Sequence, residues 1–117
     1  MSGIKVFGLK NCDKCRLALR KMIDLGFNSE LIDVRQTPLT LEKIEEMCDF
    51  FGDYILNSRS TTYRGLNSSE KQLSTISLLQ KYPALMKRPV ILAMSHKSIG
   101  WSDDIFKEWE ALVSKSS

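Results

Sequence analysis

The sequence predicts an α/β fold in a single domain, and three observations support this prediction. A chain of 117 residues, 43 % hydrophobic and 26 % charged, has the size and composition of one soluble globular domain. The short, β-rich run Ile4–Phe7 passes into an amphipathic helical pattern, as in a β-α-β unit. Near the end of the chain, the strand-like run Val90–Met94, a turn over 95–98 and a return strand over 99–101 predict a hairpin.

The first strand is expected to be buried and to end at Gly8. Asn11 is a residue type that caps helices, and the helix after it is predicted to run from Arg16 to Leu25 and to end at Gly26. Its core face consists of residues at helical spacing: Cys15, Ala18, Met22 and Leu25. A second strand with a mixed pattern is predicted over Glu30–Arg35.

A second helix is expected to open at Pro38 and Thr40 and to end at Gly52. The residues predicted to line its core face are Leu41, Ile44, Met47, Cys48 and Phe51. Residues 53–69 are interpreted as a polar loop.

Ser74 is a candidate cap for a helix that runs to about Tyr82. Ser102 can cap a last helix with two acidic residues in its first turn, where the helix dipole favours them. The first-turn acids are Asp103 and Asp104, and the inward-facing residues are Ile105, Trp109 and Leu112.

The predicted order of elements is that of a thioredoxin-like fold of the glutaredoxin type, with helices inserted between its two halves. We expect residues 1–117 to form a single domain. Its thioredoxin-like core is predicted over 1–36 and 87–117, and the helical insert over 37–86.

Two cysteines, Cys12 and Cys15, lie at the predicted junction between strand and helix. Backbone N–H groups at a helix N-terminus carry a partial positive charge, which stabilises a thiolate and lowers the thiol pKa below about 8.5. The second cysteine is within reach of a disulfide with the first, and this spacing beside a β-α-β pattern indicates a thioredoxin-like redox motif. We therefore interpret Cys12 as a catalytic nucleophile and Cys15 as a resolving thiol.

Two structural alternatives remain for this pair: both cysteines are small core side chains, or they are half of a zinc site. Zinc requires about four ligands, and the remaining candidates, Cys48 and His96, do not form a second pair. No bound metal or cofactor is expected. Cys48 is predicted to lie in the core and His96 in a solvated turn.

Composition limits the classes of partner and location. The net charge of +3 favours small anions, thiolate peptides or acidic surfaces, and the scattered basic residues argue against nucleic acid. Three cysteines are too few for a disulfide scaffold. With no signal-peptide pattern and no apolar run that could span a bilayer, a cytoplasmic protein without membrane contact is expected.

Three arginines are candidates for an anion clamp, because a guanidinium binds oxyanions and carboxylates through paired hydrogen bonds: Arg59, Arg64 and Arg88. Arg88 stands directly before Pro89, at the start of the third predicted strand. A cis peptide bond there would place the backbone of 88–90 beside the thiolate, where an extended thiol peptide could pair with it. Most X–Pro peptide bonds are trans, so a cis bond before Pro89 is expected only if the chain adopts the proposed fold.

Four segments together resemble the ArsC/Spx-like family of glutaredoxin-related arsenate reductases, over nearly the whole chain. Gly8–Cys15 is similar to the family pattern G-x-K-N-C-D-x-C, and Asp33–Thr40 to D-x-R-x-T-P-L-T. Leu56–Arg64 is similar to L-N-x-R-x-T-T-[WY]-R. Tyr82–Val90 is similar to H-P-x-L-I-K-R-P-V, with tyrosine in place of histidine. The nearest branch is the short YffB-like one, which is regarded as glutathione-dependent thiol reductases.

The resemblance implies a thioredoxin-like domain with a helical subdomain and Cys12 as nucleophile. It further implies that Arg59 and Arg88 lie near Cys12 and that Pro89 is cis. Lys10 and Asn11, beside the nucleophile, are expected to join these residues in binding substrate or anion. Members that reduce arsenate carry a third arginine after the glycine of the last hairpin, where this chain has Trp101.

Three functions follow as alternatives. The first is a thiol–disulfide oxidoreductase that uses glutathione as co-substrate, with glutathione, a disulfide protein or glutaredoxin as partner. The second is an arsenate reductase, against which Trp101 argues. The third is a redox-sensing regulator like Spx that binds RNA polymerase. Such regulators usually continue into a basic C-terminal segment, whereas this chain ends at Lys115–Ser117 soon after its last predicted helix.

Overall fold

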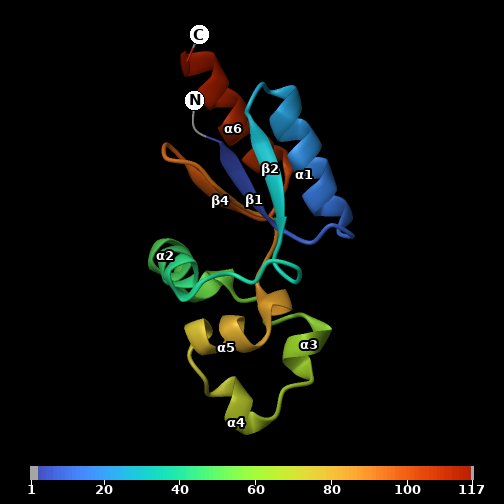
Figure 1. Ribbon diagram of the computed structural model, residues 1–117, viewed down its shortest axis with the longest axis vertical. Coiled ribbons are helices and arrows are strands. Elements are labelled where there is room, and N and C mark those ends of the chain that lie inside the picture. Colours follow the sequence, from blue (N-terminus) through green and yellow to red (C-terminus); the bar gives the residue numbers. More distant parts are fainter. Residues whose placement is uncertain (1–2, 117) are drawn as a thin grey trace. The chain divides into compact units, whose positions relative to one another are not determined.

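A four-stranded mixed sheet organises the N- and C-terminal parts of the chain in the computed structural model, which describes residues 3–116. The strand order is β2-β1-β3-β4 (Figure 1). The strands are β1 (Ile4–Gly8), β2 (Ser29–Asp33), β3 (Val90–Leu92) and β4 (Lys97–Ile99). Strand β1 runs parallel to β2 and antiparallel to β3, so Val6 lies between Leu31 and Ile91. This topology confirms the thioredoxin-like α/β fold.

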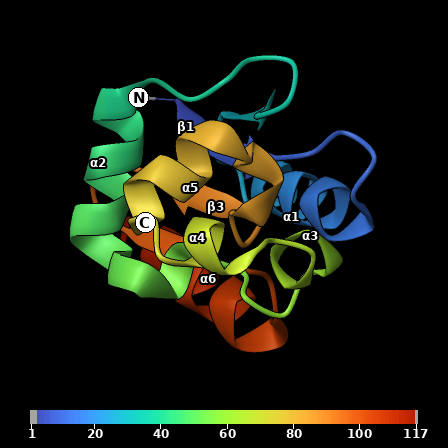
Figure 2. The same cartoon turned by 90° about the horizontal axis from the view of Figure 1, so that it is seen from below.

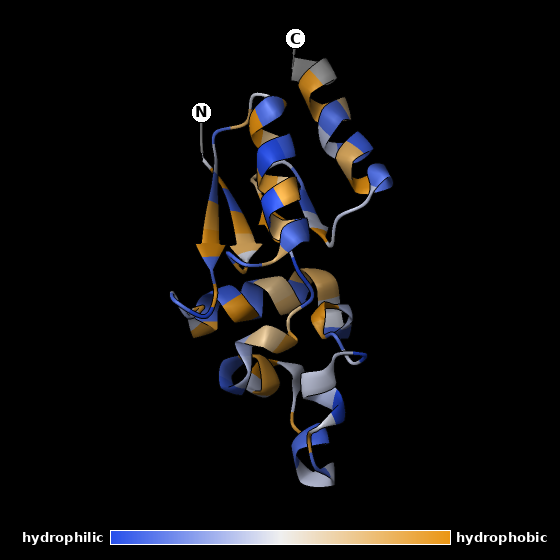
Figure 3. Ribbon diagram, turned by 90° about the vertical axis from the view of Figure 1, so that its right-hand side faces the viewer, coloured by the Kyte–Doolittle hydropathy of each residue, from blue (hydrophilic) through white to orange (hydrophobic). Residues whose placement is uncertain are grey.

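Helices α1 (Asp13–Asp24) and α6 (Asp103–Ser116) cover the same face of this sheet. Their buried residues meet those of two strands in one core cluster: Ile4, Val6, Ala18, Met22, Ile91 and Trp109. Figure 3 shows the amphipathic character of α6, which alternates between hydrophobic and hydrophilic residues up to the grey C-terminal end. Ile105 and Leu112 are partly buried against the core, and Ser102 Oγ accepts a hydrogen bond from Ile105 N–H, as predicted.

Trp109 is fully buried and joins the last helix to the hairpin. Its indole Nε1–H donates a hydrogen bond of 2.9 Å to Oγ of the buried Ser98. The His96 ring lies edge-on to the indole with a centroid distance of 4.8 Å, and its Nε2 lies 2.9 Å from Oε1 of Glu108. His96 lies in the turn as predicted, and these two contacts leave its ring partly rather than fully exposed to solvent.

The hairpin was predicted in the wrong register. The return strand is Lys97–Ile99 rather than 99–101, and the turn occupies 93–96, where Ala93 N–H donates to the His96 carbonyl at 3.0 Å. Gly100 has φ of 80°, a conformation that strongly favours glycine and takes the chain out of the strand. The strand therefore ends before Trp101.

The first β-α-β unit differs from expectation where its helix begins and where its second strand ends. Helix α1 begins at Asp13 rather than at the predicted Arg16. It ends at Asp24, with Leu25 as its C-cap and Gly26 at φ of 97°, so the predicted stop at Gly26 is confirmed. Strand β2 ends at Asp33, because residues 34–36 form a turn, whereas a strand over Glu30–Arg35 was predicted.

Val34–Lys87 forms a second compact unit, which consists of helices. These are α2 (Leu41–Phe51), η1 (Gly52–Ile55), α3 (Thr61–Arg64), α4 (Ser68–Lys71), α5 (Thr75–Lys81) and η2 (Pro83–Leu85). Helix α2 packs beside α5 (Figure 2). The caps Thr40 and Ser74 and the end at Gly52 are as predicted.

Two predictions for this unit were wrong. The segment 53–69, predicted to be a polar loop, includes most of η1, all of α3 and the start of α4. Ser60 and Asn67 accept backbone N–H groups and cap the two short α-helices. On α2, Ile44 and Met47 are buried, but Leu41 is 48 % exposed at the first position of the helix. No helix within residues 3–116 is long and apolar enough to cross a membrane.

Replacement of Met22 by alanine should lower the free energy of unfolding by about 2–5 kcal/mol, because a fully buried side chain leaves a cavity in the core. Ile23→Ala is the matched control on the same helix, since Ile23 is 52 % exposed, and should cost about 0.5 kcal/mol or less. Urea unfolding followed by circular dichroism measures both. Equal losses for the two variants would contradict the assigned core.

Candidate functional site

Cys12 itself occupies the N-cap position of helix α1, where its φ and ψ are −96° and 120°. A tight turn precedes it, in which Cys12 N–H donates to the Leu9 carbonyl at 3.1 Å, and the Cys12 carbonyl accepts from Arg16 N–H at 3.0 Å. The prediction of Asn11 as the cap was therefore wrong by one residue, because Asn11 lies exposed within the turn. The shift places the sulfur directly at the helix N-terminus.

The environment of Cys12 lowers its pKa. Partial burial acts in the opposite direction and raises the pKa, but hydrogen bonds to the sulfur outweigh it. The donors are the backbone N–H and the thiol of Cys15, the backbone N–H of Lys14 and the side chain of Arg88. In the structure these groups lie near the sulfur, but the Cys12 side chain does not form a capping hydrogen bond with the first turn of α1. The donors nevertheless lie where they favour the thiolate, whose negative charge strengthens such bonds.

Cys15 has the opposite character, although it is only one helical turn away. Its side chain is fully buried, and burial raises the pKa of its thiol to about 11, with the neighbouring Cys12 adding to the rise. At neutral pH Cys15 is therefore a protonated thiol, and its S–H group, as a potential hydrogen-bond donor, helps to lower the pKa of Cys12. Both cysteines are free in the structure.

Gly8 is the residue that makes room for Cys15. A Cβ atom built on Gly8 would overlap Sγ of Cys15 and lie 3.2 Å from its Cβ. The φ angle of Gly8 is not positive, so the requirement for glycine here is space and not backbone conformation. The first glycine of the G-x-K-N-C-D-x-C pattern thus allows the buried thiol to pack against the end of β1.

Asp33 fixes the loop that carries the nucleophile. Its Oδ2 accepts a hydrogen bond of 2.9 Å from the backbone N–H of Lys10. Asp33 also pairs with Gly8 in the sheet. Asp33 is a site residue that sequence patterns alone do not predict, although it opens the D-x-R-x-T-P-L-T segment. Lys10, by contrast, has an exposed side chain on the rim of the site.

The peptide bond between Arg88 and Pro89 is cis, which confirms what the family resemblance implies. Pro89 is buried, and its carbonyl accepts a hydrogen bond of 2.8 Å from Gly100 N–H. Because Val90 pairs with Phe7, the Arg88–Pro89 segment lies at the same end of the sheet as the Cys12 loop. The structure therefore brings six predicted site residues together: Lys10, Asn11, Cys12, Cys15, Arg88 and Pro89.

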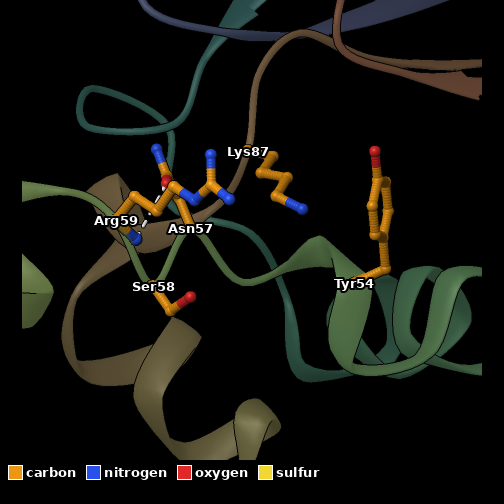
Figure 4. Close-up of a pocket in the computed structure, with 5 residues that line it drawn as sticks. All are labelled: Tyr54, Asn57, Ser58, Arg59 and Lys87. Carbon is orange, nitrogen blue, oxygen red and sulfur yellow. Dashed lines mark hydrogen bonds between the residues drawn. The ribbon is translucent and has the colours of Figure 1, made fainter.

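The other two arginines belong to the unit Val34–Lys87. Arg59 lines a pocket of about 440 Å³ together with Tyr54, Asn57, Ser58 and Lys87 (Figure 4). Arg64 is the exposed last residue of α3 and does not line this pocket. A position of Arg59 close to Cys12 stays a prediction.

The third cysteine has none of the features that activate Cys12. Cys48 is half-buried on α2, and burial, followed by the negative charges of Asp53 and Asp49, raises its pKa. Its thiol is therefore protonated at neutral pH and a poor nucleophile. Within residues 3–116, no group of three or more potential His, Cys, Asp or Glu ligands is close enough to hold a metal ion.

Gly8→Ala should destabilise the protein by about 1–3 kcal/mol, because the new methyl group collides with the Cys15 sulfur in a packed core. Gly3→Ala is the control, since a Cβ there meets only the Asn28 carbonyl at 3.8 Å. The cost should shrink when Cys15→Ala is combined with Gly8→Ala, and a double-mutant cycle of urea unfolding measures this coupling. Strictly additive costs would refute the packing explanation.

Comparison with known proteins agrees with this geometry. The model of the ArsC family matches residues 7–109. An uncharacterized protein of Haemophilus influenzae is 35 % identical over 92 % of this chain and 96 % of its own length. An arsenate reductase of Neisseria meningitidis and the global transcriptional regulator Spx of Listeria innocua are each 26 % identical over 86 % of this chain, and these matches cover 92 % and 82 % of those proteins.

A solved structure of a YffB protein superposes with a TM-score of 0.81 at 24 % identity, over 90 % of this chain and 96 % of that one. This likeness supports the fold. The family model and the relative from Haemophilus influenzae cover almost the full sequence, including the Cys12 loop and the cis proline. The chain belongs to the ArsC family.

Proposed function

We propose that this protein is a thiol–disulfide oxidoreductase in which the Cys12 thiolate is the nucleophile and glutathione is the co-substrate. The ArsC family membership and the thioredoxin-like fold support the class of thiol oxidoreductase. The observation that carries the specific proposal is the contrast within the Cys12–Cys15 pair. One thiol is partly exposed with a lowered pKa, and the other is buried with a pKa of about 11.

In the first step, the Cys12 thiolate attacks one sulfur of a glutathione mixed disulfide or of a protein disulfide. A new bond forms between Cys12 Sγ and that sulfur, the original S–S bond breaks, and the second sulfur leaves as a thiolate that takes a proton from solvent. An extended substrate can align along the backbone of 88–90 at the cis proline. When Cys12 is released again as a thiolate, the N-terminus of α1 stabilises its negative charge.

In the second step, a free glutathione thiolate attacks the glutathione sulfur bound to Cys12. For a glutathione mixed disulfide, the products are oxidised glutathione and the regenerated Cys12 thiolate, so one free glutathione thiol is consumed for each substrate thiol released. For a protein disulfide, a first glutathione thiolate attacks Cys12 Sγ and displaces the bound protein sulfur as a thiolate, and a second glutathione completes this step, so two glutathione thiols supply two electrons. We favour this route over attack by Cys15, because a buried thiol with a pKa of about 11 has little thiolate at neutral pH. This cycle fits a reducing cytoplasm, where free glutathione is available. Glutaredoxin is proposed as a partner protein.

The positive groups beside Cys12 support an anionic, peptide-like substrate. Arg88 acts on the sulfur directly, while Lys10 and Lys14 are exposed around it. Glutathione carries two carboxylates, and basic side chains near a reactive thiol attract such ions and raise the rate of encounter. Asn11 and Arg59 are proposed as further polar groups for the same ligand.

Arsenate reduction is less well supported than disulfide reduction. Trp101 stands where arsenate-reducing members carry a third arginine, and its indole is half-buried against the core, edge-on to Phe106 at a centroid distance of 6.2 Å. A neutral side chain engaged in packing supplies no charge for an oxyanion. Arsenate-dependent oxidation of NADPH in a coupled glutathione and glutaredoxin assay, absent in Cys12→Ser, would reverse this preference.

Turnover of a glutathione mixed disulfide should be lost in Cys12→Ser and retained within a few-fold in Cys15→Ser. The matched control is Cys48→Ser, because Cys48 is a half-buried thiol with a raised pKa outside the proposed chemistry. Mass spectrometry after incubation with oxidised glutathione should find one glutathione on Cys12. Full activity in Cys12→Ser would contradict the proposed nucleophile, and an internal Cys12–Cys15 disulfide would contradict the external resolving thiol.

The regulator alternative has its own test with the same variants. A protein like Spx would bind the C-terminal domain of the RNA polymerase α-subunit in a manner that depends on oxidation of Cys12 and Cys15. Capture of that domain by the oxidised protein, together with no disulfide turnover, would replace the proposed function by this one.

A further inference from the structure

The outer face of α1 has positive charges without carboxylate partners, on the same helix as the nucleophile. Cys12 is the N-cap of this helix, and three cations occupy exposed positions after it: Lys14, Arg20 and Lys21. None of the salt bridges within residues 3–116 involves these three side chains, whereas lysines of β1, α2 and α5 each pair with a glutamate. The outer face of α1 is therefore a strip of uncompensated positive charge.

The positions of the basic residues reduce the stability of α1 instead of adding to it. Lys14 stands in the first turn, where the helix dipole favours acidic side chains and disfavours cations. Arg16 and Arg20 are one turn apart, and like charges at i and i+4 repel each other. Among the basic residues of α1, Arg16 alone forms a salt bridge, with Asp13. Helix stability does not explain such a pattern, but binding of an acidic partner does.

Leu17 lies at the centre of this strip. It is an exposed apolar side chain, with 39 % of its surface accessible. Helical spacing surrounds it with the three cations, which lie three residues before it and three and four residues after it. In Figure 3, where α1 faces the viewer, hydrophobic positions interrupt its mostly hydrophilic outer side. An apolar centre with a charged rim is the usual anatomy of a protein–protein contact.

A second contact holds one of these cations at the surface. Nζ of Lys21 lies 5.7 Å from the centre of the Phe106 ring of α6. An aromatic ring attracts an ammonium group but does not neutralise its charge, so Lys21 stays available to a carboxylate. The contact restricts the motion of a long side chain, and a restricted side chain loses less entropy when a partner binds.

The composition of this face favours an acidic protein surface over a nucleic acid. Asp13 and Asp24 stand at the two ends of α1, and the apolar Leu17 lies between them. A nucleic acid binds through closely spaced phosphates, to which acidic and apolar side chains offer no contact. A protein partner can place carboxylates opposite the cations and an apolar group opposite Leu17.

We infer that Lys14, Leu17, Arg20 and Lys21 form a docking surface for an acidic segment of a protein whose disulfide is reduced at Cys12. This inference deepens the proposed function, on which it rests for the disulfide chemistry, and it identifies the substrate class as protein disulfides with acidic residues nearby. The docking surface contains no thiol and takes no part in electron transfer. All of it belongs to the same compact unit as the nucleophile.

The rise of the helix sets the place at which a partner's acidic residue meets the far end of the docking surface. Arg20 is eight residues beyond Cys12, which corresponds to about 12 Å along the helix axis. An extended peptide covers that distance in about four residues. Carboxylates four and five residues from the reacting cysteine should therefore reach Arg20 and Lys21, whereas carboxylates directly beside it meet only Lys14.

The test measures kcat/KM for the removal of glutathione from synthetic peptides that hold it on a single cysteine. Two peptides of equal length and charge have glutamates either four and five residues from the cysteine or directly beside it, and a third has lysines at the distant positions. At low salt, the distant-glutamate peptide should react about tenfold faster than the lysine peptide. Sodium chloride should reduce this ratio, because it screens charges on an exposed surface.

Charge reversal on α1 should remove the preference for distant glutamates. Arg20→Glu combined with Lys21→Glu should abolish it, and the milder pair Arg20→Gln with Lys21→Gln should reduce it, which guards against a folding defect of the reversed charges. Lys107→Glu is the matched control and should keep the preference, because Lys107 is an exposed lysine of α6. Equal rates for glutamate and lysine peptides, or an unaltered ratio in the charge-reversed variant, would overturn the docking surface.

Binding without chemistry separates this inference from the proposed function. The distant-glutamate peptide with serine in place of its cysteine should still shift the amide NMR signals of α1, and less so in the charge-reversed variant. Such binding by a protein that removes no glutathione would support the docking surface and refute the proposed function, whereas turnover with no glutamate preference would do the reverse. An RNA oligonucleotide of equal charge that binds α1 more tightly than this peptide would overturn the assignment to a protein partner.

Discussion

The interaction on which the rest depends is that between the sulfur of Cys12 and the N-terminus of α1. An N-cap residue normally offers an oxygen to the unpaired N–H groups of the first helical turn, and here a thiol stands in that position. The same N–H groups that need an acceptor therefore stabilise the thiolate, and the pKa of Cys12 falls despite partial burial. The position at the helix end is therefore what makes this sulfur a nucleophile.

Several parts of the core hold this arrangement in place. Met22 and Trp109 pack α1 and α6 onto one face of the sheet, which fixes the direction of the α1 axis. Asp33 anchors the loop through Lys10 N–H, and Gly8 leaves space for the Cys15 sulfur beneath it. The buried thiol is thereby held near Cys12 as a potential hydrogen-bond donor and kept away from solvent. Its chemistry differs from that of Cys12 because its burial differs.

The sequence predicted the parts of this picture that depend on local patterns. Cys15, Ala18 and Met22 are buried, because helical spacing alone puts them on one face. The N-cap was placed one residue early, since its position depends on the turn tied to Asp33 by a contact between distant segments. Helix α4 was missed because four residues carry no periodicity, although its Asn67–Glu70 capping box is a local signal. The pocket in the helical unit needed the pairing of residues 55–57 with 85–87, which no local pattern reveals.

The pKa of Cys12 in the folded and unfolded chain tests the central claim most directly. In a Cys15→Ser, Cys48→Ser variant Cys12 is the only remaining thiol. The serine hydroxyl at position 15 can still donate a hydrogen bond to the Cys12 sulfur. Ultraviolet absorbance of the thiolate should give a lower pKa for the folded protein than for the same chain in concentrated urea, because unfolding removes the helix N-terminus and separates Arg88 from the sulfur. Equal values in the two states, or a higher value in the folded protein, would contradict the account.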